Sequence, residues 1–211
     1  MANQAILQIV LQVVVALGTL AVAVLAIWGD WFRDRLASPK LELRLRDSRG
    51  NPTSLNGRRA IYYHLVVQNK RRWALATGVQ VMINGIWRRA ADGTFKPEIL
   101  AAELPLTWAF PQFTPINPKI RDRKVCDLGF LAEGDKEFKP SLYFYPNNFR
   151  GFVKANDSIR LSIGIQAENF TSHQRFVVEI SWDGVWDSDL DQMEKHLVVK
   201  EVQEHMPDSG I

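Results

Sequence analysis

The sequence predicts an all-β domain of short antiparallel strands, preceded by one N-terminal transmembrane α-helix. The helix is predicted by residues 5–28 (AILQIVLQVVVALGTLAVAVLAIW), which carry no charge and exceed the roughly 20 apolar residues that cross a bilayer core. The β domain is predicted by about eight or nine short segments that alternate with period two or are rich in β-branched residues, separated by turn residues. No long amphipathic helical pattern follows the apolar run, which favours a β-sandwich or barrel.

The apolar run has the features of an anchor rather than of a cleaved signal peptide. A signal peptide has a basic n-region and a shorter apolar core, whereas Met1 to Gln4 contain no Lys or Arg and the run is too long. The remaining length suffices for one domain with its own core. We therefore expect a transmembrane helix at 1–28, a juxtamembrane linker at 29–38, a β-sandwich domain at 39–203 and a flexible tail at 204–211.

The charges beside the run predict its orientation. Arg33, Arg35 and Lys40 follow the run closely, and no basic residue precedes it. Because basic flanks stay on the cytoplasmic side, we expect the N-terminus outside the cell (inner) membrane and the C-terminal domain in the cytoplasm. The single cysteine, Cys126, allows no intramolecular disulfide, which agrees with a reducing compartment.

One face of the predicted helix is small and polar. Small residues let helix backbones approach, and Gln or Thr hydrogen-bonds across a helix pair, so this face predicts association with a second copy or with a partner's helix. The alternative is that alanine is ordinary in a membrane span and that the glutamines reach the nearby interface. The face consists of Ala5, Gln8, Gln12, Ala16, Thr19, Ala23 and Ala26.

The strand pattern begins after Pro39, where Leu41, Leu43 and Leu45 alternate with charged residues. Residues 46–57 contain Asp, Ser, Gly, Asn and Pro and predict a loop. Residues 193–202 predict a last strand or a short helix, with the β-branched HLVVKEV favouring strand. The remaining predicted strands are 60–69, 78–87, 98–108, 123–131, 141–145, 158–168 and 174–182.

Four segments resemble parts of a known kind of domain. Residues 60–83 (AIYYHLVVQNKRRWALATGVQVMI) resemble a strand pair in bacterial immunoglobulin-like or adhesion-like domains. With LPLTW at 104–108, DLGFL at 127–131 and ISWDGVW at 180–186, the chain is similar to uncharacterised bacterial single-pass membrane proteins that carry such a domain. The resemblance implies an antiparallel immunoglobulin-like β-sandwich and implies no catalytic residue.

A run of basic residues is the main candidate for a binding site. Lys70, Arg71, Arg72 and Trp73 are predicted at a hairpin tip, supported by the pairs Arg58–Arg59 and Arg88–Arg89. Three cations and an indole can hold a phosphate and stack on a base or a lipid headgroup region. The alternative is a solvated turn whose Trp73 packs at the core edge. A second basic cluster consists of Lys119, Arg121, Arg123 and Lys124.

Trp186 is a candidate contact residue beside the Asp183–Gly184 turn, whereas Trp182 is expected in the core. The series Asp187, Asp189 and Asp191 begins like a calcium loop, but the template then requires Gly and Glu where the chain has Gln192 and Val198. A solvated acidic turn is therefore favoured.

The sequence contains none of the motifs that identify a catalytic or metal site. Its four histidines lack metal-ligand spacing from one another and from Cys126, and no phosphate-binding Gly-rich loop or Gly-x-Ser-x-Gly motif occurs. We therefore expect no enzyme activity, metal or cofactor.

The leading hypothesis is a non-enzymatic membrane protein whose cytosolic β-sandwich binds a protein partner, as a scaffold or accessory subunit of a membrane complex. Membrane lipid, the chain itself through its helix, and more weakly nucleic acid or a nucleotide are the other expected partners. The alternative is an oligomerising membrane effector of a bacterial antiviral system, triggered by a partner, nucleic acid or nucleotide signal. That alternative rests on analogy of architecture.

Overall fold

The computed structural model describes residues 2–171 and 176–202, and the chain divides into two units between Ser38 and Pro39. The first unit is one helix, α1 (Ala2–Ala37). Within it, Ile6–Gly29 is long and apolar enough to cross a membrane, as the sequence predicts.

The segment predicted as the juxtamembrane linker, residues 29–38, is helical as far as Ala37, because α1 continues through it. The segment WFRDRLA contains no Pro or Gly, so nothing in it breaks a helix. The helix ends where Pro39 disfavours a helical conformation for Ser38. The predicted tail at 204–211 lies outside the described residues.

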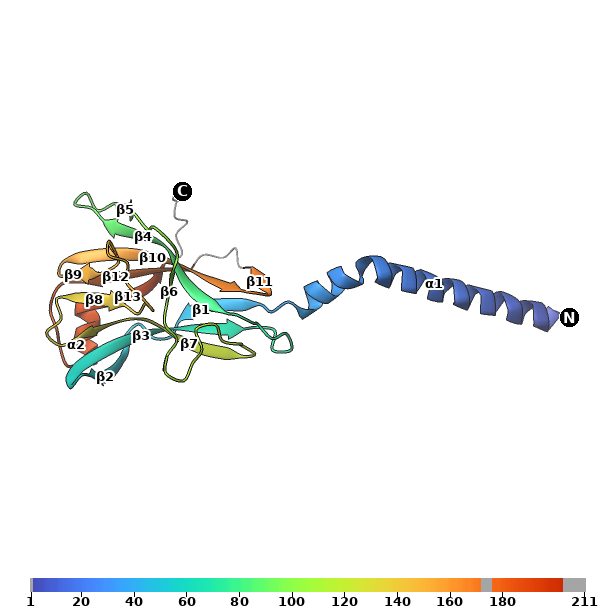
Figure 1. Ribbon diagram of the computed structural model, residues 1–211, viewed down its shortest axis with the longest axis horizontal. Helices are drawn as coiled ribbons and strands as arrows, with labels where there is room; N and C mark the ends of the chain where they lie inside the picture. Colours follow the sequence, from blue (N-terminus) through green and yellow to red (C-terminus); the bar gives the residue numbers. More distant parts are fainter. Residues whose placement is uncertain (1, 172–175, 203–211) are drawn as a thin grey trace. The chain divides into compact units, whose positions relative to one another are not determined.

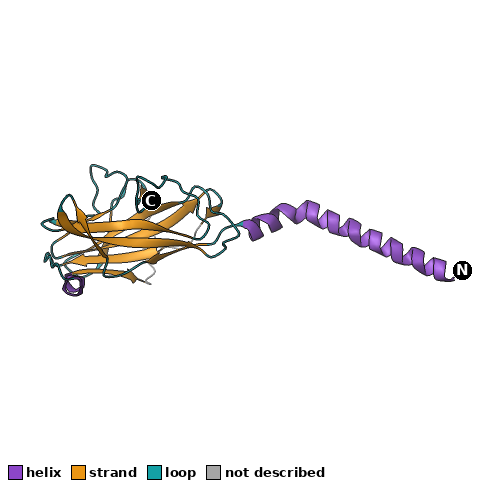
Figure 2. Ribbon diagram, turned by 90° about the horizontal axis from the view of Figure 1, so that it is seen from below, coloured by secondary structure: helices purple, strands orange, loops and turns teal. Residues whose placement is uncertain are grey.

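The second unit contains two antiparallel sheets (Figures 1 and 2), which confirms the all-β prediction. One sheet has the order β1-β3-β7-β8-β9, with β2 on β3; the other has the order β13-β12-β10-β4-β5, with β11 on β10 and β6 on β4. The strands of the first sheet are β1 (Leu41–Leu45), β2 (Asn51–Leu55), β3 (Arg58–Asn69), β7 (Arg123–Ala132), β8 (Glu137–Pro140) and β9 (Val153–Lys154). The strands of the second sheet are β4 (Gln80–Arg89), β5 (Phe95–Glu98), β6 (Leu104–Pro105), β10 (Asp157–Ala167), β11 (Phe170–Thr171), β12 (Phe176–Trp182) and β13 (Leu197–Val202).

Three predictions about strands are wrong. The predicted loop at 46–57 contains β2, which has no apolar alternation and pairs with β3 through an Asn56–Gly57 turn of positive φ. Most of the predicted strand at 98–108 is irregular around the short β6, and β5 precedes it. The predicted strand at 141–145 is not a strand; β8 lies just before it.

The ambiguous segment at 193–202 contains both predicted alternatives. Helix α2 (Leu190–His196) is followed directly by β13, which pairs with β12 as an edge strand. The β-branched residues fall in the strand, and the helix begins at an Asp N-cap.

The core lies between the sheets, where alternate residues of each long strand point inward. In β3 these are Ile61, Tyr63, Leu65 and Val67, and β10 contributes its own apolar series. One edge is bridged by residues 104–108, because Pro105 pairs with Met82 of β4 and Trp108 bridges to Cys126 of β7.

The loops of the domain gather at its two ends. We call the end where β1 begins the proximal end, because the chain continues there into α1. It also holds the end of β3 and the starts of β4 and β7. The opposite, distal end holds the β2–β3 turn, the β4–β5 turn and the residues around α2.

Candidate functional sites

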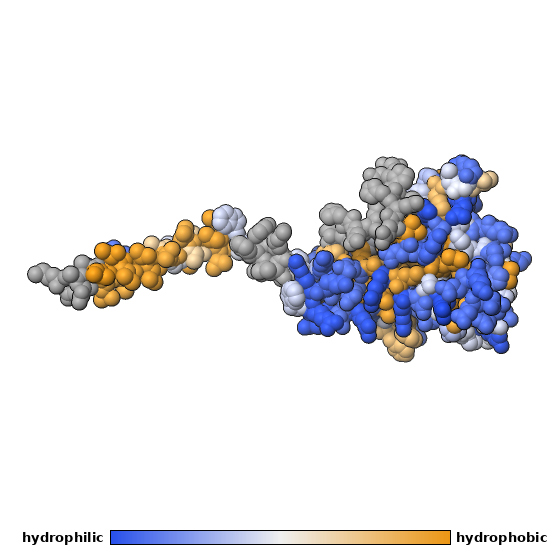
Figure 3. Space-filling view, turned by 180° about the vertical axis from the view of Figure 1, so that it is seen from behind, coloured by the Kyte–Doolittle hydropathy of each residue, from blue (hydrophilic) through white to orange (hydrophobic). Residues whose placement is uncertain are grey.

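Five residues of the predicted association face lie within the candidate membrane span. Gln8, Gln12, Ala16, Thr19 and Ala23 follow one another at helical spacing, and all five are exposed. The Thr19 hydroxyl donates to the carbonyl of Val15 at 2.9 Å, within the same helix. None of the span is buried, and Figure 3 shows apolar side chains covering it. This helix therefore presents both its apolar residues and its Gln face to its surroundings.

The structure separates the residues of the predicted basic patch. Lys70, Arg71, Arg72 and Trp73 do not form a hairpin tip, because β3 and β4 on either side belong to different sheets. Arg58 and Arg59 begin β3, whereas residue 70 follows its end, and a strand of this length spans about 36 Å. The prediction that these residues form one patch is therefore wrong.

The separated arginines have local contacts at the distal end. Arg58 donates to Asp135 at 2.7 Å and to the carbonyl of Glu133 at 3.0 Å, which holds the β7–β8 turn. Arg59 instead lines a cavity of about 390 Å³ together with Trp186. Two sequence candidates that were predicted separately therefore share one cavity.

Trp186, the candidate contact residue, is half-buried against the core. Its Nε1 is buried and has no hydrogen-bond acceptor among the described residues. Trp182 is in the core, as predicted, and its Nε1 donates to the carbonyl of Val185 at 3.0 Å. The exposed apolar residue of this loop is Val185.

The acidic series before α2 builds backbone turns. The Asp187 side chain accepts from the amide of Asp189, and the Asp189 side chain accepts from the amide of Asp191, both at 2.8 Å. Asp189 is thereby the N-cap of α2. Across the described part of the chain, no cluster of three potential metal ligands occurs.

Two histidines form separate pairs with carboxylates. His64 Nδ1 lies 2.8 Å from Asp127 on the outer face of the first sheet, and His196 Nδ1 lies 2.7 Å from Asp183 at the distal end. Burial alone would raise the pKa of Asp183, but the bonds from His196 and from the Val185 amide prevail and lower it. Cys126 is fully buried, and this burial raises the pKa of its thiol.

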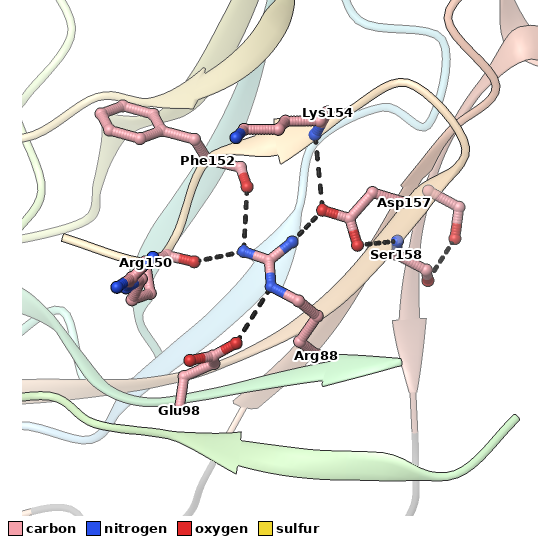
Figure 4. A network of polar contacts seen from close by, with 8 residues as sticks. Arg88, Glu98, Arg150, Phe152, Lys154, Asp157 and Ser158 are labelled. Atoms are coloured by element: carbon pink, nitrogen blue, oxygen red, sulfur yellow. Dashed lines mark hydrogen bonds and ion pairs between the residues drawn. The ribbon is translucent and has the colours of Figure 1, made fainter. Parts of the chain in front are cut away.

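A network of polar contacts is centred on Arg88, as Figure 4 shows. Its guanidinium donates to Glu98 at 3.1 Å, to Asp157, and to the carbonyls of Arg150 and Phe152 at 2.5 and 3.2 Å. Asp157 in turn accepts from the Ser158 amide at 2.8 Å. Arg88 thus joins β4 to β5 and to the segment that leads into β10.

A second ion cluster surrounds Glu179 on the outer face of the second sheet. Glu179 is 3% exposed and accepts from Arg89, Arg160 and Lys200 at 2.8–3.3 Å. The Arg160 guanidinium also lies 3.9 Å from the centre of the Phe95 ring. The cluster joins four strands, β4, β10, β12 and β13, and includes Arg89, which the sequence analysis groups with the basic patch.

A cavity of about 570 Å³ lies beside this cluster at the distal end. Its polar lining includes Arg89, Lys195 and His196, together with the hydrogen-bonded hydroxyls of Ser158 and Ser181. Asp157 and Asp183, which also line it, are already paired with Arg88 and His196.

At the proximal end the structure joins two basic segments that the sequence treats separately. Ala76 and Ile120 form a backbone bridge, and Arg72 pairs with Asp122 at 3.0 Å. The second basic cluster therefore adjoins residues 70–73. Large apolar side chains are exposed on the same two loops, at Trp73, Phe110 and Phe113. The two Phe residues lie in the Pro-rich segment FPQFTP.

Comparison of the chain with protein-family models, curated proteins and solved structures gave no match.

Proposed function

We propose that this chain is a non-enzymatic, single-pass membrane protein whose β-sandwich binds a protein partner as a scaffold or accessory subunit. The observation that carries the proposal is the exposed apolar helix Ile6–Gly29, joined to a domain that has its own core. In water such a helix would expose a continuous apolar surface, which lipid or other membrane helices cover.

We further propose that the sandwich is immunoglobulin-like. In that fold one sheet contains strands A, B and E as neighbours, and the other contains C, F and G. The neighbours β1-β3-β7 and β4-β10-β12 follow the same orders along the chain, which supports the assignment. The domain departs from that pattern in β8, which follows β7 in the chain, and in the additional edge strand β13.

The roles of the polar clusters favour binding over catalysis. The side chains of Arg88 and Glu179 are occupied by contacts that join strands. The pair His64–Asp127 lies on the first sheet, whereas the pair His196–Asp183 joins α2 to the loop after β12 at the distal end. The contacts of these groups are explained by their contribution to the stability of the fold.

The scaffold hypothesis is tested by exchanging the helix. Replacing residues 6–29 with an unrelated apolar helix should leave the proteins that co-purify with the detergent-solubilised chain unchanged in identity and stoichiometry. The matched control keeps α1 and lacks residues 39–202, and it should lose those proteins. Loss of the partners on helix exchange alone would contradict the hypothesis that the sandwich is the binding module.

We also propose that the domain lies in the cytoplasm, as the flanking charges indicate. Wild-type Cys126 cannot test this because it is buried, so a thiol is introduced by Ala91→Cys at the exposed β4–β5 turn. A membrane-impermeant thiol reagent should label this variant only after the cells are permeabilised. Wild type is the control, and labelling of the variant in intact cells would refute the orientation.

The second candidate function, an oligomerising membrane effector, is favoured by the Gln face of α1. Gln8→Leu with Gln12→Leu should abolish cross-linked oligomers in vesicles and any leakage of their contents, since Gln hydrogen bonds between helices are lost. Val10→Leu with Val14→Leu is the matched control on other positions of the helix. If both double variants form oligomers equally well, the Gln face does not direct assembly.

A further inference from the structure

We propose that the proximal loops of the sandwich form a docking surface for an anionic lipid bilayer. The surface combines the exposed aromatic side chains of Trp73, Phe110 and Phe113 with basic residues of the same loops and of the adjoining starts of β1 and β7. We call it the basic-aromatic surface. Its basic residues are Lys40, Lys70, Arg71, Arg72, Lys119, Arg121, Arg123 and Lys124. The inference rests on the proposed membrane anchorage and extends it from the helix to the domain.

The two loops are held together by backbone contacts. The Ala76 and Ile120 amides donate to each other's carbonyls at 3.0 and 2.8 Å, and the Val79 amide donates to the carbonyl of Pro118 at 3.1 Å. The buried Asn69 side chain accepts from the amide of Lys40 and donates to the carbonyl of Ala74. These contacts fix residues 70–79 against residues 118–120, so the basic residues of the two loops are held as neighbours.

The aromatic side chains project from fixed backbone positions. Trp73, Phe110 and Phe113 are 73%, 72% and 83% exposed. The Phe113 amide donates to the Phe110 carbonyl at 2.9 Å, and buried Trp108 donates to the carbonyl of Ile116 at 3.0 Å. Phe110 has a φ of 57°, a left-handed conformation that bulky residues rarely adopt. The loop thus keeps two large apolar groups in water, where only burial against another apolar phase recovers their hydrophobic free energy.

The charge around these aromatic groups is strongly positive. Residues 40–42, 69–79 and 109–124 contain eight Lys or Arg and two carboxylates, which gives a net charge of +6. Glu168, whose side chain lies against Gly78, lowers this to +5. Glu42 and Asp122 pair with Lys70 and Arg72. Within the described ranges, 2–171 and 176–202, the remaining cluster of Lys119, Arg121, Arg123 and Lys124 forms no ion pair.

The covalent tether and the chemistry together favour lipid as the occupant. Pro39 lies ten positions after Gly29, the end of the apolar span, so even an extended chain places them at most about 36 Å apart. This keeps the local concentration of lipid headgroups high at the basic residues. Anionic headgroups attract Lys and Arg, and Trp and Phe enter the interfacial layer of a bilayer. The basic residues would also attract nucleic acid, and the test below distinguishes nucleic-acid binding from lipid binding.

The test uses the full chain in vesicles, with a polarity-sensitive fluorophore on Gln112→Cys, an exposed position between the two Phe residues. Buried Cys126 stays unlabelled, and Ala91→Cys at the distal end is the matched control. The emission from position 112 should shift to the blue and be quenched by nitroxide-labelled lipid when phosphatidylserine is added to phosphatidylcholine. Position 91 should respond to neither, and high salt should reverse the response at position 112.

Two variants separate the contributions of charge and apolar contact. Lys119→Glu with Arg121→Glu should lower the docked population at least about tenfold, since each basic residue near an anionic surface contributes about fivefold. Phe110→Ser with Phe113→Ser should abolish lipid quenching while leaving the chain in the membrane. Equal signals from positions 112 and 91 would overturn the inference. So would a signal at position 112 that appears with a single-stranded oligonucleotide and not with phosphatidylserine.

Membrane anchoring through α1 is measured separately, by flotation of the chain with vesicles. A chain that floats without quenching at position 112 contradicts only the docking surface. A chain that does not float contradicts the membrane anchor itself.

Discussion

Replacing Arg88 by Met should destabilise the sandwich by about 3 kcal/mol. Met keeps most of the apolar length of the side chain but removes every hydrogen bond of the guanidinium. Two carboxylates, of Glu98 and Asp157, and two carbonyls, of Arg150 and Phe152, then lose a donor. The expected loss follows from how far these groups are buried.

Breaking a fully buried ion pair costs about 3–5 kcal/mol, and a hydrogen bond to a charged group contributes about 1.5–3 kcal/mol. The Arg88 and Glu98 side chains are each 28% exposed, whereas Asp157 is 15% exposed. Water therefore compensates part of the loss at Glu98 and less at Asp157. This places the cost near the lower limit for a buried pair, equivalent to a fall in melting temperature of about 6–12 °C for a domain of this size.

The measurement is thermal and denaturant unfolding of the detergent-solubilised full chain, followed by tryptophan fluorescence and near-ultraviolet circular dichroism. Arg44→Met is the matched control, because Arg44 is exposed on β1 and a surface substitution changes stability by at most about 0.5 kcal/mol.

A double-mutant cycle isolates the pair with Asp157. Asp157→Asn should destabilise wild type by about 1–3 kcal/mol more than it destabilises Arg88→Met, since the two residues are in contact. If Arg88→Met is no less stable than Arg44→Met, the network is not what holds the distal loops.

Three further predictions concern single sites. Burial alone would raise the pKa of Glu179, but Arg160 and Lys200 prevail and lower it, so the stability it contributes is present above the ordinary pKa of 4.5 and is lost as the pH falls through the lowered value. Glu179→Gln should therefore destabilise the domain at pH 7, and denaturant unfolding from pH 7 to pH 3 should show the difference from wild type shrinking in acid; a constant difference would contradict the ion cluster. Asp189→Ala should cost about 1 kcal/mol of unfolding free energy through loss of the α2 N-cap, and an unchanged denaturation midpoint would show that the cap contributes nothing. Cys126, whose burial raises the pKa of its thiol, should resist thiol reagents at pH 7 until the domain unfolds, so modification at the rate of a free thiol would show that the core opens there.

The surroundings of the basic and aromatic residues could not be predicted from the sequence. Residues Lys70–Trp73 are recognisable by their basic composition, but composition does not say which other loops surround them. Because β3 pairs with β1 and β7 along its length, Arg58 and Arg59 at its start lie at the distal end, away from residues 70–73. The Ala76–Ile120 bridge instead adds Lys119 and Arg121 to the proximal loops. The aromatic groups at Phe110 and Phe113 could not be predicted as exposed, because the same residues in a core loop would have the same local sequence.

The sequence by itself determined the membrane-length helix, the all-β character of the domain and the long strands β3, β4, β7, β10 and β12. These follow from local properties: uninterrupted hydrophobicity over a bilayer thickness, and alternation of apolar residues with the period of a strand. The tertiary structure alone decided the division of the strands into two sheets, the formation of β2 and β8, and the partners of charged residues such as Arg88, Glu179 and Arg58. Those features depend on contacts between segments distant in the chain, where one strand supplies the hydrogen bonds or the countercharge that another lacks.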